Sequence, residues 1–87
     1  MHERKLMDDL MGKIETELRA ADASRVTVIR VRLGALSHFT EAHFREHFED
    51  ASRGTVAEGA VVEAELRTDP TEAEAQGVVL ESIEVEL

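Results

Sequence analysis

The chain opens with Met1, His2 and Glu3, whose donor atoms lie close enough along the chain to chelate one metal ion. The α-amine, the backbone nitrogen of His2 and the Nδ1 atom of its imidazole would close a five-membered and then a six-membered ring. The Glu3 backbone nitrogen and carboxylate lie within reach of the same ion. Ni²⁺ and Cu²⁺ accept such square-planar, nitrogen-rich coordination. We therefore predict an N-terminal metal site, with Met1 retained because methionine aminopeptidases remove it only before small residues.

The other three histidines, His38, His43 and His47, fall in one short stretch. His43 and His47 are four positions apart, so their rings project from the same face of a helix and could share one metal ion. His38 lies just before that predicted helix, and residues 34–37 could bring it towards the N-terminus. In the alternative interpretation, the helical histidines are half-buried or exposed residues that flank the apolar face of the helix. We expect all three to be secondary to the N-terminal site.

Composition limits the classes of function that the chain could have. Its 87 residues make one domain, and 10 basic against 19 acidic residues give a net charge of −9. This charge argues against nucleic acid and anionic membranes and favours a basic protein partner. The chain has no cysteine, so a thiolate metal cluster and a cysteine nucleophile are excluded. With no apolar run long enough to span a membrane and no signal-peptide pattern, we expect a cytoplasmic location.

Hydrophobic periodicity predicts the elements that must position these residues. Apolar residues at helical spacing predict an amphipathic helix over residues 4–21. Residues 25–33 alternate and predict a strand with apolar side chains on one face and Arg30 and Arg32 on the other. A second helix over 41–52 is predicted from the N-cap Thr40, from a hydrophobic staple between Phe39 and Phe44, and from Gly54 beyond its end.

Two further strands follow, with apolar alternation over 62–66 and 83–87, and a polar loop over 68–77 separates them. The predicted fold class is α+β, a two-layer sandwich of two helices packed on one face of a three-stranded mixed sheet, in the order helix-strand-helix-strand-strand. A right-handed crossover would make the first two strands parallel, and the short loop would make the last two an antiparallel hairpin. The last strand is predicted to be an edge, where Glu81, Glu84 and Glu86 either guard against aggregation alone or also meet a partner.

The sequence gives little support to an enzyme. It has no Gly-rich phosphate loop, no nucleophile elbow and no Cys/His pair. Its many carboxylates fall on the solvent face of the predicted strands, where they are most simply solubilising. We expect a binding protein.

Four segments together resemble the HypA/HybF family of nickel metallochaperones for hydrogenase maturation. They are Met-His-Glu at the start, residues 31–37, residues 53–60 and residues 80–86. The resemblance implies that Ni²⁺ is bound as cargo through Met1, His2 and Glu3. It also implies two partners, a nickel–iron hydrogenase large-subunit precursor and the nickel-accessory GTPase. The sequence leaves the oligomeric state open, including a homodimer.

The chain departs from this family between its last two strands. The family normally carries a zinc ribbon there, with two Cys-x-x-Cys pairs, whereas this chain has only the loop 68–77 and no cysteine. We therefore expect no structural zinc and a single nickel-binding domain over 1–87. An alternative function is a metal-independent interaction module of the same fold that docks a maturation partner.

Overall fold

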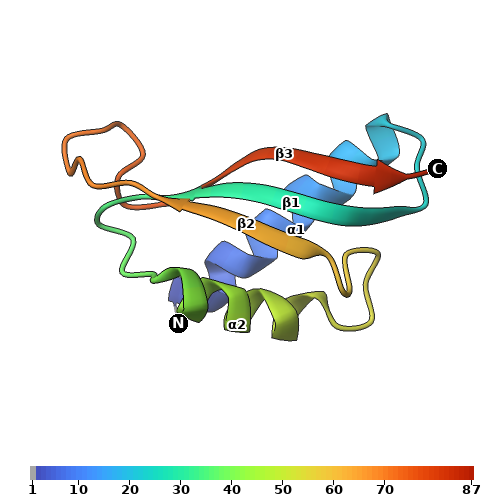
Figure 1. Cartoon of the computed structure of the whole chain (residues 1–87), viewed down its shortest axis with the longest axis horizontal. Helices are drawn as coiled ribbons and strands as arrows, with labels where there is room; N and C mark the ends of the chain where they lie inside the picture. Colours follow the sequence, from blue (N-terminus) through green and yellow to red (C-terminus); the bar gives the residue numbers. More distant parts are fainter. Residues whose placement is uncertain (1) are drawn as a thin grey trace.

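Two helices cover one face of a three-stranded sheet (Figure 1). The computed structural model describes the backbone of residues 2–87 and the side chains from residue 4 onwards, so Met1 and the side chains of His2 and Glu3 lie outside the described residues. The elements in chain order are α1 (His2–Ala20), β1 (Arg25–Leu33), α2 (Glu41–Ser52), β2 (Val61–Leu66) and β3 (Val78–Glu86). The predicted α+β class and two-layer arrangement are confirmed.

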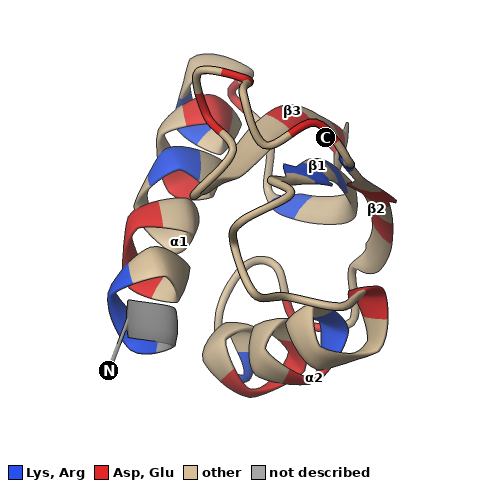
Figure 2. Cartoon of the chain, turned by 90° about the vertical axis from the view of Figure 1, so that its left-hand side faces the viewer, with Lys and Arg blue, Asp and Glu red and all other residues tan. Residues whose placement is uncertain are grey.

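The helix α1 forms over residues 2–20, close to the predicted 4–21. Its buried stripe recurs at helical spacing and consists of Met7, Leu10, Met11, Ile14 and Leu18. The helix stops before Asp22, which has a left-handed φ of 53°. Aspartate adopts this conformation more readily than most residues do. Within residues 2–87, no helix is long and apolar enough to cross a membrane. The side view in Figure 2 shows α1 beside β3 and α2 below the sheet on the side of β2.

The strand β1 lies in the middle of the sheet, which has the order β2-β1-β3. It pairs in parallel with β2 and antiparallel with β3, so the predicted parallel pairing of the first two strands and the mixed sheet are both confirmed. The predicted hairpin between the last two strands is wrong, because the loop after β2 carries the chain past the end of β1 to its other edge. The central position suits β1, since Val26, Ile29, Val31 and Leu33 are each at most 1% exposed.

Two irregularities in the pairing of β1 with β3 keep apolar side chains on the helix-covered face. One lies at Thr27, where the register shifts between Val26 and Val28, so the buried residues Val26 and Ile29 are three positions apart. The other lies at Glu81 in β3. The strand β3 is longer than predicted because it begins at Val78, and it is an edge strand as predicted.

The helix α2 has the predicted bounds and the predicted cap. The backbone N–H of His43 donates to the Thr40 side-chain oxygen at 3.1 Å. The rings of Phe39 and Phe44 meet edge to face at 5.6 Å, as a hydrophobic staple requires. The helix ends before Gly54, whose φ of +79° is left-handed. This end fixes the direction in which the chain turns towards β2.

Candidate metal centre

The described part of the N-terminal donor set, the backbone of His2 and Glu3, lies in the first turn of α1. The described part of this helix starts at His2, and the first N–H groups of a helix have no carbonyl partner four residues earlier. The backbone nitrogens of His2 and Glu3 are therefore outside the helical hydrogen-bond ladder. A chelate that uses these nitrogens would break no helical hydrogen bond.

The structure brings His43 and His47 together on one face of α2. Their Nε2 atoms are 2.9 Å apart and their ring centroids are 4.6 Å apart. This separation is that of a hydrogen bond in which one imidazole donates and the other accepts. His43 is exposed and His47 is half-buried, so the pair is accessible from solvent. The predicted proximity of these two rings is confirmed.

The ring of Phe39 packs against both imidazoles. Its ring centroid lies 5.5 Å from that of His43 and 6.0 Å from that of His47. Phe39 is only 4% exposed, and its ring packs perpendicular to that of Phe44. Sequence reasoning assigned Phe39 only to the staple and missed its contact with the histidines. The spacing of residues 39, 43 and 47, four positions each, was the available signal.

His38 does not join this pair. It lies in the linker before α2 with a φ of 66°, and its side chain is exposed. Among the described residues, no group of three or more His, Asp or Glu side chains is arranged to hold a metal ion. The structure therefore gathers two of the three predicted secondary ligands and leaves the third apart.

The open face of the sheet carries paired charges. Arg30 of β1 bonds Glu63 of β2 at 2.8 Å and also Glu84 of β3, and these carboxylates, Glu84 first, raise the pKa of its guanidinium. Arg32 lies 3.5 Å from Glu81. Two of the three glutamates predicted to guard β3 thus face arginines of the central strand. The sheet face is a charge-paired surface and not a purely acidic one.

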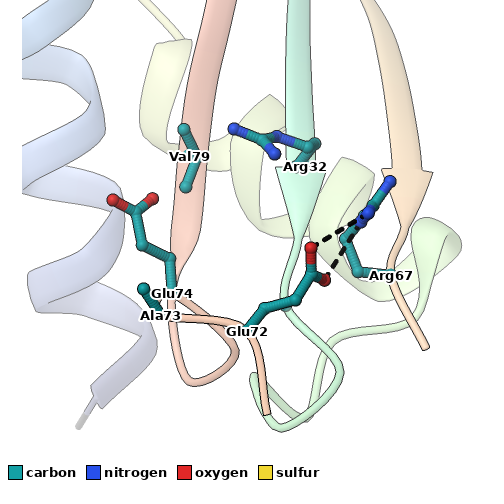
Figure 3. A pocket seen from close by; sticks show the side chains of 7 residues that line it. Arg32, Arg67, Glu72, Ala73, Glu74 and Val79 are labelled. Carbon is teal, nitrogen blue, oxygen red and sulfur yellow. Dashed lines mark hydrogen bonds and ion pairs between the residues drawn. The ribbon is translucent and has the colours of Figure 1, made fainter. Parts of the chain in front are cut away.

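A pocket of about 340 Å³ lies where the loop 67–77 meets the ends of the strands (Figure 3). Arg67 closes one side through two hydrogen bonds to the Glu72 carboxylate, at 3.1 and 2.9 Å. This pairing with Arg67 lowers the pKa of Glu72. Arg32 and Val79 line the pocket from β1 and β3, and none of its lining residues is a histidine. The pocket is therefore not a nitrogen-ligand metal site.

Backbone hydrogen bonds join the same loop to the linker that leads into α2. The N–H of Gly34 donates to the Gly77 carbonyl at 2.9 Å, and the N–H of Leu36 donates to the Ala75 carbonyl at 2.7 Å. Ala75 is 4% exposed. The loop is thus an ordered cover over the end of β1, next to the segment that carries His38 and Phe39.

These features describe a small α+β domain with two solvent-accessible imidazoles on α2 and no catalytic constellation among the described residues. The model of the family described as "Hydrogenase/urease nickel incorporation, metallochaperone, hypA" matches residues 1–83. The chain therefore belongs to the HypA family, as the four sequence segments indicated. The description is that of a metallochaperone for nickel and not that of an enzyme, which agrees with the expectation from the sequence.

Individual relatives support this assignment. The chain is 42% identical over 66 residues to a hydrogenase maturation factor HypA from Methylocella silvestris, covering 76% of this chain and 58% of the relative. It is 37% identical over 59 residues to the hydrogenase maturation factor HybF of Escherichia coli, covering 68% and 52%. The chain thus spans little more than half the length of these curated relatives.

A solved structure shares the fold. The nickel metallochaperone HypA from Helicobacter pylori superimposes with a TM-score of 0.77, covering 97% of each chain. The sequence identity is 14%, so this similarity supports the fold alone. The two-layer arrangement of α1 and α2 on β2-β1-β3 is therefore one that a nickel metallochaperone also adopts.

Proposed function

We propose that this chain binds one Ni²⁺ through the Met1 amine, the His2 backbone nitrogen and imidazole, and Glu3, and delivers it during maturation of a nickel–iron hydrogenase. The observation that supports this most is the family match, which includes these first three residues. The start of α1 at His2 also supports it, because the required backbone nitrogens make no helical hydrogen bond.

A positive ion at the N-terminus of a helix meets an unfavourable dipole, but the effect is small. The macrodipole contributes about 0.3–1 kcal/mol near a helix end. Metal–ligand bonding in small zinc peptides is worth about 10–16 kcal/mol, so the donor atoms decide the outcome. The dipole moreover favours the deprotonated, negative form of the His2 backbone nitrogen. Binding should weaken as the pH falls, because the amine, amide and imidazole must all lose protons.

Delivery requires direct contact with partners, and we propose the hydrogenase large-subunit precursor and the nickel-accessory GTPase for this role. The ion pairs on the sheet and the adjoining loop involve three arginines (30, 32 and 67) and five glutamates (63, 65, 72, 81 and 84). These eight residues have a net charge of −2, whereas the whole chain has a net charge of −9. Most of the excess negative charge therefore lies elsewhere, including on α1 and α2. Association with a basic partner should slow as salt rises.

The alternative function, docking without metal handling, predicts that no nickel passes from this chain to its partner. A transfer experiment therefore distinguishes the two functions. Nickel-loaded protein is mixed with purified hydrogenase large-subunit precursor, and nickel in the precursor is measured after separation. The wild type should transfer nickel, whereas His2→Ala should bind the precursor equally well and transfer little. The control His38→Ala, which removes a histidine from outside the proposed site, should behave as the wild type does. Equal transfer by His2→Ala would contradict the proposal.

We also propose that the polar loop predicted over 68–77, which occupies residues 67–77 between β2 and β3, lies where the family carries its zinc ribbon. It is held at Gly34 and Leu36 by backbone hydrogen bonds and needs no metal ligand for its shape. The nickel-binding domain then extends over residues 1–87. Metal analysis of purified protein should show no stoichiometric zinc, and one tightly held zinc per chain would contradict this proposal.

A further inference from the structure

We propose that His43 and His47 form a second metal site on α2, a two-imidazole clamp for a divalent ion whose ligands stand at right angles, such as Ni²⁺ or Cu²⁺. The site is separate from the N-terminal chelate and does not depend on it. It consists of two residues of one helix and the phenyl ring beneath them. His38 is not part of it.

The separation of the two nitrogens selects the geometry of the metal. With metal–imidazole bonds of about 2.0–2.1 Å, two nitrogens at right angles lie about 2.9 Å apart, and two nitrogens at a tetrahedral angle lie about 3.3–3.4 Å apart. The two Nε2 atoms are 2.9 Å apart. The clamp therefore matches two adjacent positions of a square-planar or octahedral ion better than two positions of tetrahedral Zn²⁺.

The two rings are held in place before any metal arrives. Both belong to the first two turns of α2, which Thr40 caps at the N–H of His43. Phe39 contacts both rings at centroid distances of 5.5 and 6.0 Å and is itself buried. Binding thus orders few additional torsions, which lowers its entropic cost. When a metal ion takes the place of the shared hydrogen, the donor imidazole passes that proton to solvent and takes one up on its Nδ1, so both neutral rings bind the ion through Nε2.

The charge of the helix also favours a cation. Residues 41–52 contain four acidic residues and one basic residue, Arg45. The guanidinium of Arg45 donates to the carbonyl of Val62 at 3.0 Å, so it is engaged with β2. The field along the helix is therefore negative on balance, and it attracts a divalent ion.

Two protein ligands leave the remaining coordination positions of the ion to water. No group of three ligand side chains occurs among the described residues, so the clamp alone does not enclose the ion. An ion held in this way exchanges its other ligands readily. Such a site suits transient capture of a metal better than a structural role.

The test uses the full chain carrying His2→Ala, which removes the N-terminal imidazole and isolates the second site. Calorimetric titration with Ni²⁺ should show one binding event in this background. Adding His47→Ala or His43→Ala should weaken it at least tenfold, and adding His38→Ala should leave it within twofold. In NMR spectra, Ni²⁺ should broaden the ring signals of His43 and His47 at a lower metal ratio than those of His38.

The clamp is overturned if His2→Ala shows no binding event, or if His38→Ala weakens it as much as His47→Ala does. It is also overturned if Zn²⁺ binds more tightly than Cu²⁺ in the same background. Circular dichroism of each variant verifies that α2 is intact, and His47→Gln supplies a second variant of similar size. Failure of the N-terminal site would show as identical titration curves for the wild type and His2→Ala, whatever His47→Ala does in the His2→Ala background, so the two proposals fail independently.

Discussion

A Cβ atom placed on Gly34 would overlap the carbonyl oxygen of Ala75, so the end of β1 and the loop 67–77 are in direct backbone contact. The carbonyl of Glu74 is almost as close, at 2.6 Å from the same position. Backbone cannot move aside as a flexible side chain would. Glycine at position 34 is therefore required by space, and its φ is not the reason.

The first prediction is that Gly34→Ala destabilises the domain by about 1–3 kcal/mol, because the added methyl group forces the loop away from β1. Urea denaturation followed by circular dichroism measures the change. Gly12→Ala is the matched control, since a Cβ there would meet nothing within 4 Å. Because Gly12 lies inside α1, this control should stabilise by about 0.5–1 kcal/mol. Equal effects of the two substitutions would refute the close contact.

The second prediction concerns pH and the loop. Arg67 lowers the pKa of Glu72, so the carboxylate is ionised more readily in the folded state than in the unfolded state. Its contribution to stability is present above the ordinary pKa of a glutamate and is lost as the pH falls through the lowered value. In Arg67→Gln, the pKa of Glu72 should rise towards its ordinary value in an NMR titration. An unchanged titration of Glu72 would show that the pair does not form in solution.

The third prediction is that Thr40→Ala costs about 1 kcal/mol, because it removes the side-chain oxygen that caps α2. Thr40→Ser keeps that oxygen and should be nearly neutral. Thermal unfolding measures both variants. The same loss should increase hydrogen exchange at the N–H of His43, which donates to the cap. Normal exchange in Thr40→Ala would mean that the first turn of α2 is held by other contacts.

The fourth prediction is that the fold needs no metal. Its core is built from both helices and all three strands, and includes Ile14, Ile29, Phe44 and Phe48, each at most 1% exposed. Circular dichroism in excess chelator should therefore retain both the helix and the strand signals. An unfolded spectrum would show that bound metal supplies the stability that we assign to burial.

Local patterns determined much of the fold. The bounds of β1 and α2 were predicted correctly because alternation, the Thr40 cap and the glycines at 34 and 54 act within a few residues of the chain. The family could also be inferred, since its four segments are contiguous in sequence. The proximity of His43 and His47 followed from helical spacing alone.

What escaped prediction depends on residues far apart in the sequence. In the order β2-β1-β3 the apolar strand β1 is paired on both edges and lies in the middle of the sheet. A short loop by itself instead favours a hairpin between β2 and β3. The bulge positions at Thr27 and Glu81 are set by how β1 and β3 pair. The pairing of Arg30 with Glu63 and Glu84 joins three strands, so no pattern within one strand could indicate it.

Calorimetric titration with Ni²⁺ of the untagged chain, and of a chain extended by two residues before Met1, shows whether the N-terminal amine holds nickel. The extension converts the amine into an amide and leaves every described residue unchanged. We predict one tight event in the untagged chain and a loss of at least 100-fold in affinity in the extended chain and in His2→Ala. Identical titration curves for all three proteins would contradict the proposed N-terminal site, because nickel would then bind without the N-terminal amine and imidazole.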